Sequence, residues 1–115
     1  EAGAAVVPDI LERFPDVDCI FSVSDAAAFG VQSRLKSFGI SVPEDIGVAG
    51  FGNFEVSRFA SPSISTVVVD SKRIGREAGR LIGELLGAGG TSRAPVHIDV
   101  DPMPMLRDST KARTS

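Results

Sequence analysis

Residues 33–55, SRLKSFGISVPEDIGVAGFGNFE, decide the fold that this sequence predicts. In order they indicate the end of a helix, a glycine stop at Gly39, a Pro-acid turn, a short apolar strand and a Gly-Phe-Gly-Asn break. Set between two more strand-like runs, this order is typical of a parallel α/β sheet flanked by helices. Ligands of such sheets bind outside the carboxyl ends of the strands, so a binding site is expected at the breaks that follow them.

The segments on either side continue the same alternation. An apolar run at 19–23 predicts a strand buried on both faces, and apolar residues at three- and four-residue steps predict a helix over 26–38. The remaining patterns predict a helix over 7–14, strands over 46–51 and 64–69, a loop over 53–63 with room for one helical turn, a helix from 70 or 71 to about 86, and a last strand over 96–100. The fold class is therefore α/β, built from βαβ units with right-handed crossovers.

Length and composition limit both the architecture and the partners. At 115 residues, of which 43% are hydrophobic and 23% charged, the sequence predicts one small, ordered domain. Its formal net charge is −3 and it has no basic block, which argues against DNA binding by this chain alone. No apolar run reaches the length of a membrane span, so no membrane partner is expected. The single cysteine, Cys19, favours a reducing, cytoplasmic setting, and we expect it to be a small buried hydrophobe.

Polar groups follow the predicted strands at 24–25, 51–53 and 69–70. Because the carboxyl ends of parallel strands meet at one edge, two carboxylates, an amide, a hydroxyl and an aromatic ring are expected to share a crevice there. This combination is typical of carbohydrate recognition, in which polar groups satisfy hydroxyls and an aromatic face covers the apolar side of the sugar ring. Two of these residues have equally good structural explanations: Asp25 as a helix cap, and Asn53 as a residue that tolerates a left-handed turn.

The sequence gives little support for phosphate binding, catalysis or metal binding. Residues 50–55 begin like a dinucleotide-binding motif, but Glu55 replaces the third glycine, and its charge would repel a pyrophosphate. The glycine turn at 87–90 lacks the Gly-Lys-Ser/Thr of a phosphate-binding loop, and no Gly-x-Ser-x-Gly motif is present. His97 is the only histidine, and with one distant cysteine it makes no metal-ligand set. The sequence therefore predicts no catalytic residues, no metal and no cofactor.

Three glycines spaced four apart, Gly75, Gly79 and Gly83, mark the last predicted helix. We expect them to allow close backbone packing against the sheet. Each weakens a helix by about 1 kcal/mol relative to alanine, so this helix should depend on tertiary contacts.

Several motifs in the same order and spacing resemble the effector-binding domain of lactose-repressor-type (LacI/GalR) transcription regulators. They are FSVSD at 21–25 with Ala28 and Gly30, GISVPEDI at 39–46, VAGF at 48–51, SPSISTV at 61–67, Gly75 with Ala78, and RDST at 107–110. The resemblance covers nearly the whole chain. It implies a periplasmic-binding-protein type fold, in which two subdomains hold a small sugar or related effector and control how a helix-turn-helix head binds its operator. It also implies that this chain corresponds to roughly the last third of such a protein, without the DNA-binding head, and that it is not an enzyme.

The resemblance assigns the effector site to the same strand ends. The residues concerned are Ser24, Asp25, Phe51, Gly52, Asn53 and Val69. Gly52 stands where many family members have an aspartate that binds ligand hydroxyls, and Val69 replaces a residue that is often polar. A less acidic pocket accepts an anionic ligand more readily. Because GFGNFE also resembles gluconate-type repressors, the expected effector is a sugar acid.

Family members commonly form homodimers through this part of the protein. The matching surfaces are the helix with Ala26, Phe29 and Ser33, and the loop from Phe54 to Ala60, which includes Phe59. Phenylalanines in a loop are explained either by a partner or by packing back on their own core. Operator DNA is expected to be bound only through the head outside this chain.

Two alternatives from other classes stay open at this point. A periplasmic sugar-binding protein of a transporter shares the fold and would be monomeric. An enzyme with a flavodoxin-like or Rossmann-like fold would need a cofactor loop or a catalytic set, and the sequence shows neither.

Overall fold

A computed structural model of the chain describes residues 2–87, 89 and 94–112. It forms two compact units, Glu1–Val68 with Met103–Ser115, and Val69–Pro102. The length of the chain predicted a single small domain, and that expectation stays a prediction.

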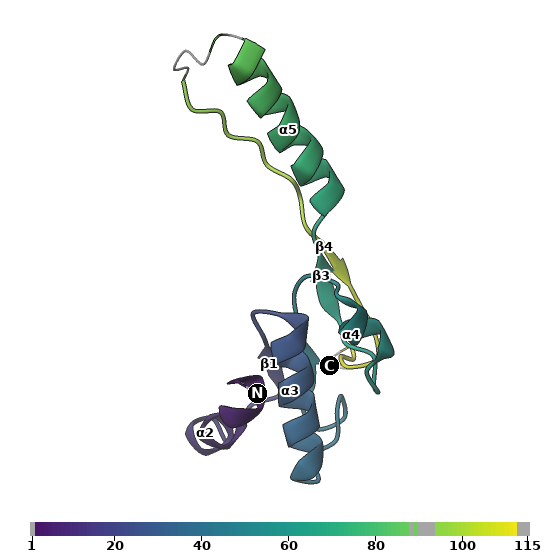
Figure 1. Cartoon of the computed structure of the whole chain (residues 1–115). Coiled ribbons are helices and arrows are strands. Elements are labelled where there is room, and N and C mark those ends of the chain that lie inside the picture. The colour runs from purple at the N-terminus through teal and green to yellow at the C-terminus, as the bar shows by residue number, and fades with distance from the viewer. Residues whose placement is uncertain (1, 88, 90–93, 113–115) are drawn as a thin grey trace. The chain divides into compact units, whose positions relative to one another are not determined.

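The first unit holds most of the secondary structure (Figure 1). Its elements are α1 (Ala2–Ala5), α2 (Val7–Arg13), β1 (Cys19–Phe21), α3 (Asp25–Ser37), β2 (Gly47–Ala49), α4 (Glu55–Phe59), β3 (Thr66–Val68) and β4 (Met103–Met105). The predicted helices at 7–14 and 26–38 and the helical turn within 53–63 are confirmed to within one or two residues. The predicted strands are present but shorter, three residues each.

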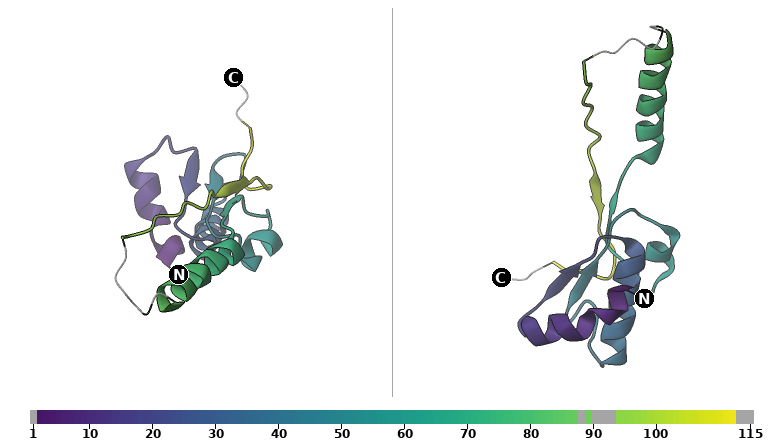
Figure 2. Two further views of the ribbon diagram at one scale, coloured as in Figure 1. Left: turned by 90° about the horizontal axis from the view of Figure 1, so that it is seen from above. Right: turned by 60° about the vertical axis from the view of Figure 1, so that its left-hand side comes forward.

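Strand pairing is mixed rather than purely parallel. β1 and β2 pair in parallel, with Ile20 opposite Val48. A parallel bridge joins Ala49 to Ser65, just before β3. β3 and β4 lie side by side and antiparallel (Figure 2), with Val67 opposite Pro104. The last strand, predicted at 96–100, is therefore at Met103–Met105, because these residues find the backbone partners that β3 offers.

Local sequence explains where α3 begins and ends. Ser24 is extended, and its Oγ accepts a hydrogen bond from the Ala27 amide at 3.2 Å, which is the usual N-cap arrangement. At the other end, the Gly39 amide donates to the carbonyl of Lys36. Gly39 has a φ of +75°, a left-handed value that glycine adopts without a steric penalty.

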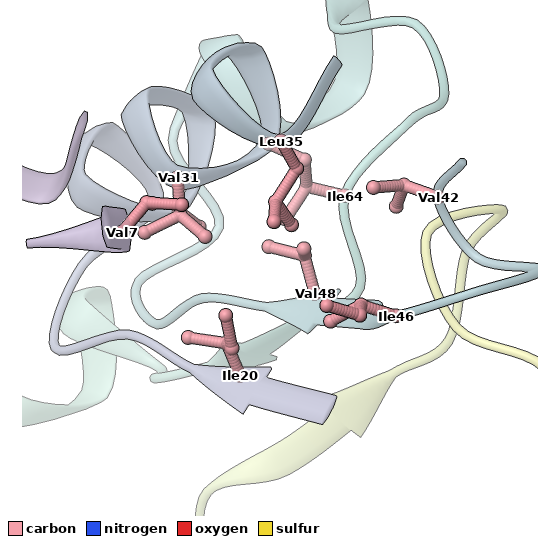
Figure 3. Close-up of a cluster of buried hydrophobic side chains, with 9 residues drawn as sticks. Val7, Ile20, Val31, Leu35, Val42, Ile46, Val48 and Ile64 are labelled. Carbon is pink, nitrogen blue, oxygen red and sulfur yellow. The ribbon is translucent and has the colours of Figure 1, made fainter. Parts of the chain in front are cut away.

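The hydrophobic core lies between α3 and the strands. Val31 and Leu35 of α3 point toward Ile20 of β1 and Val48 of β2, as Figure 3 shows. Val7 of α2 completes one end of this cluster and is fully buried. The core therefore fixes the strand ends from which the candidate site is built.

Two predictions about β1 are wrong. The strand is buried on one side only, with Ile20 inside and both Cys19 and Phe21 exposed, because in the described chain only one face of β1 carries a packed helix. Cys19 is therefore not a buried hydrophobe. Partial desolvation of its sulfur, together with the nearby Asp18 carboxylate, raises the pKa of the Cys19 thiol.

The second unit contains α5 (Ser71–Gly87) and the extended segment 94–102. No described residue of α5 is buried, and a Cβ added at Gly75, Gly79 or Gly83 would meet no atom within 4 Å. Close packing of these glycines against the sheet, which belongs to the first unit, stays a prediction. Arg80 forms ion pairs with Glu77 at 3.0 Å, three residues before it, and with Glu84 at 2.7 Å, four residues after it. Within the described residues, no helix has the length and apolar character needed to cross a bilayer.

Candidate functional site

The carboxyl ends of β1 and β2 bring two of the predicted segments together. The Asp25 amide donates to the carbonyl oxygen of Phe51 at 3.1 Å, which joins the start of α3 to the segment after β2. Ser24, Asp25, Phe51, Gly52 and Asn53 therefore belong to one edge, as predicted. Val69 begins the second unit, so it is not among the residues whose arrangement at this edge the structure describes.

Asp25 is fully buried, and both of its carboxylate oxygens accept hydrogen bonds. Oδ2 accepts from the Phe54 amide at 2.7 Å, and Oδ1 accepts from the Thr66 hydroxyl at 2.6 Å. Because Ser24 caps α3, the interpretation of Asp25 as only a cap is wrong. Its carboxylate joins the segment after β2 to β3, and a buried carboxylate needs these donors to offset its lost hydration. A direct contact between Asp25 and an effector stays a prediction.

The residues after β2 form a tight turn in which the amides of Gly52, Asn53 and Phe54 donate to internal acceptors. The Gly52 amide donates to the carbonyl of Val67 at 2.9 Å, and the Asn53 amide to the Thr66 hydroxyl at 3.2 Å. Asn53 has a φ of +57°, which confirms the prediction that it occupies a left-handed turn. The same turn gives Gly52 a φ of +114°.

The conformation of this turn disfavours a side chain at position 52. The φ of Gly52 lies in a region that residues with a side chain rarely adopt, and a Cβ there would lie 2.5 Å from a ring carbon of Phe54, so that this exposed ring would have to move. An aspartate at this position would therefore strain the turn as it is seen here.

Arg107 is a member of this edge that sequence reasoning did not single out. Its Nη2 donates to Asn53 Oδ1 at 2.7 Å, and its Nη1 donates to Ser57 Oγ at 2.9 Å and to the carbonyl of Ile64 at 3.1 Å. The only signal was its place in the RDST motif at 107–110, to which no role was given. The next residues of that motif are equally integrated, since the fully buried Ser109 hydroxyl accepts from the Ser65 amide at 2.8 Å.

Phe51 supplies the aromatic group at this edge, with 39% of its surface exposed. A cleft of about 390 Å³ lies in the first unit, lined by Phe21, Gly50, Thr66, Val67 and Leu106 among others, and none of the predicted site residues lines it. A larger cleft of about 470 Å³ lies at the opposite, amino ends of β1 and β2, where Asp18 and Gly47 line it, and it too contains none of the predicted site residues. In the part of the chain that the structure describes, no three acidic, histidine or cysteine side chains are grouped so that they could hold a metal ion.

The residues predicted at a dimer interface are accessible. Ala26, Phe29 and Ser33 are exposed on α3. Phe54 is 62% exposed and Phe59 81% exposed, so the alternative that these rings fold back on the core is wrong. Pairing through this surface stays a prediction.

Comparison with known proteins gives consistent results over most of the chain. The sequence profile of the periplasmic binding protein-like domain matches residues 1–110. The chain is similar to the HTH-type transcriptional regulator CelR of Thermobifida fusca, with 31% identity over 109 residues that cover 95% of this chain and 32% of that protein. The chain thus spans about a third of the length of the curated relatives that it matches.

Solved structures extend the same similarity to the fold. A LacI family transcriptional regulator from Silicibacter pomeroyi matches with a TM-score of 0.83 and 55% identity, over 96% of this chain and 38% of that one. A complex of the transcriptional regulator CelR with cellobiose matches with a TM-score of 0.84 and 33% identity, over 93% of this chain and 32% of that one.

Proposed function

This chain belongs to the periplasmic binding protein-like domain family in its LacI-type form, and on that premise we propose that it is the ligand-sensing and dimerisation part of a transcriptional repressor. The protein that contains it would bind a small sugar or sugar acid and thereby control operator binding through a helix-turn-helix segment outside this chain. A regulator of this kind acts where the DNA is, in the cytoplasm. The acidic net charge of −3 supports the assignment of DNA contacts to another segment.

The observation that carries this proposal is the organised edge at the carboxyl ends of β1 and β2. Three successive amides of the turn at 52–54 are held by internal acceptors. The turn is therefore preorganised, which reduces the conformational entropy lost when a ligand binds. Phe51 offers an exposed ring next to it, and Ser24 and Asn53 supply polar side chains at the same edge. We expect these three residues to contact the effector directly, while Gly52 and Asp25 shape the turn; Val69 stays a predicted member of the site.

A sugar acid is the effector that this edge favours. Gly52 has no carboxylate, and the carboxylate of Asp25 is buried and fully hydrogen-bonded. The next carboxylate in the sequence, Glu55, lies in the first turn of α4. An anionic ligand would therefore meet less repulsion here than in a pocket with an aspartate at position 52.

A thermal-shift panel on the full-length protein that contains this chain tests the proposal. A ligand at one hundred times its dissociation constant adds about 2.7 kcal/mol to the free energy of unfolding. We expect gluconate and related sugar acids to raise the melting temperature, and neutral glucose and cellobiose to raise it less. A rise with neutral sugars alone would reject the sugar acid and retain a sugar sensor. A panel without any rise would reject both sugars and sugar acids as effectors, and would leave an effector of another class or a role other than sugar sensing.

A pair of variants locates the site. Phe51→Ala should weaken ligand binding, because it removes the ring at the predicted edge. Phe38→Ala removes a ring of similar exposure at the far end of α3 and should leave binding unchanged. Equal effects of the two substitutions would place the effector elsewhere.

A further inference from the structure

We propose that Arg107 is a positioning residue that fixes the orientation of the Asn53 side-chain amide, so that Asn53 offers N–H donors to the effector. The inference rests on the proposed sensing function and deepens it, because it names the chemistry that the site selects. The ligand group that fits such a site is an oxygen acceptor, and a carboxylate fits best.

The orientation follows from the chemistry of the two side chains. A guanidinium group only donates hydrogen bonds, so the end of the Asn53 amide that faces Arg107 at 2.7 Å is its oxygen, Oδ1. The other end, Nδ2, has no partner among the described residues. The only buried side-chain polar atom without a partner in the described chain is Gln32 Oε1, so Nδ2 of the half-buried Asn53 is open to solvent.

Arg107 is itself held firmly enough to impose this orientation. Its Nη1 donates to Ser57 Oγ and to the carbonyl of Ile64, and its own backbone amide donates to Ser65 Oγ at 2.8 Å. The planar fork of the guanidinium group is fixed by contacts in two directions, which a lysine ammonium group cannot reproduce. Rotation of the Asn53 amide by 180° would place its NH₂ group against the donors of Arg107 and break the bond.

The side-chain amide is the hydrogen-bond donor of Asn53 that remains available to a ligand. Its amide N–H is used by Thr66 Oγ, and its φ of +57° fixes the direction in which the side chain leaves the turn. Arg107 forms no ion pair with an acidic side chain within the described residues, so its positive charge is not neutralised by a neighbouring carboxylate. The N–H donors of the Asn53 side chain and the positive charge of Arg107 therefore both favour a ligand that is anionic or rich in hydrogen-bond acceptors.

Asn53→Asp tests the donor role with almost no change in shape. The new carboxylate keeps an oxygen for Arg107 and forms an ion pair with it, while the NH₂ group is replaced by an acceptor. In the full-length protein we expect gluconate affinity to fall by at least about tenfold, with the melting temperature of the ligand-free protein unchanged or raised. Asn53→Gly keeps the left-handed turn without an amide, and it should also lose affinity. Unchanged gluconate affinity in Asn53→Asp would overturn the donor role.

Amide hydrogen exchange tests the positioning role without any ligand. In Arg107→Lys, we expect the amides of Asn53 and Phe54 to exchange roughly tenfold faster, while those of Val31 in α3 keep their rate, because the loss is local. Arg76→Lys, at an exposed arginine of α5, is the matched control and should change neither. Equal exchange rates in the wild type and Arg107→Lys would overturn the role of Arg107.

The two experiments separate the possible failures. If gluconate does not bind the wild-type protein, the proposed sugar-acid effector is wrong, whatever the exchange data show. If gluconate binds but Arg107→Lys changes neither the exchange of the turn nor the affinity, the sensing function stands and the role of Arg107 is wrong.

Discussion

At the scale of single residues, the candidate site depends on partners that are far apart in the sequence. Asp25 and Asn53 were predicted at the sheet edge because each follows a strand. Their partners were not, because Thr66 is 41 residues from Asp25 and Arg107 is 54 residues from Asn53. Thr66 lies in the SPSISTV motif and Arg107 in the RDST motif, but neither motif indicates which residue is the partner. Only the folded chain shows that they fix the turn after β2.

Thr66→Val should destabilise the protein by about 1–3 kcal/mol. The substitution removes the donor to Asp25 Oδ1 and the acceptor of the Asn53 amide, and both groups would remain in the interior. Thr66→Ser keeps the hydroxyl and is the control, for which a much smaller loss is expected. Urea unfolding measures both variants. A midpoint for Thr66→Val equal to that of Thr66→Ser would show that the hydroxyl contributes little.

At the scale of elements, the helices were easier to predict than the strands. The helix over 26–38 has a cap, an apolar period and a glycine stop, and all three signals are local. The strands are only three residues long, and their extent depends on which backbone groups find a partner. The segment at 96–100 has the apolar pattern of a strand but pairs with no other strand in the described chain. Met103–Met105 pairs with β3, although its sequence does not have that pattern.

Two glycine-to-alanine substitutions should change stability in opposite directions. Gly79→Ala in α5 adds a Cβ that meets no atom within 4 Å, so it should strengthen the helix by up to about 1 kcal/mol. In Gly50→Ala the Cβ would lie 2.4 Å from Asp25 Oδ1 and 2.9 Å from Asp25 Cα, and it should cost about 1–3 kcal/mol.

Far-UV circular dichroism during thermal unfolding measures both substitutions. Gly79→Ala should increase the helical signal of the folded protein. A loss of stability in Gly79→Ala would mean that α5 packs closely against other residues at this position.

At the scale of the whole molecule, composition and the order of motifs predicted the α/β class and the resemblance to LacI-type regulators, and the comparisons confirm both. The division into two compact units was not predicted, because local patterns do not reveal which segments share contacts. The sequence also did not predict which of the loop phenylalanines are exposed. Phe54 and Phe59 had two explanations until their exposed fractions were known.

Phe59→Ser should weaken the proposed homodimer without destabilising the fold, since 81% of this side chain is exposed. Sedimentation of the full-length protein at several concentrations measures the change, with a lower average mass expected for the variant. Arg58→Ser, at an exposed neighbour on α4, is the control and should leave the profile unaltered. An unchanged profile for Phe59→Ser would show that this ring does not contribute to the interface. A wild-type protein that is monomeric at all concentrations would favour the transporter alternative.

The position of residues 107–110 in the first unit affects the order in which a newly made protein can fold. Ser109 completes the backbone bonding of Val48, and Arg107 holds Asn53, yet both are synthesised after the whole of α5. The strand ends of β1 and β2 and the start of α3 are therefore made before the residues that complete their sheet edge. This edge of the first unit cannot reach its final structure until residues 107–110 have been synthesised.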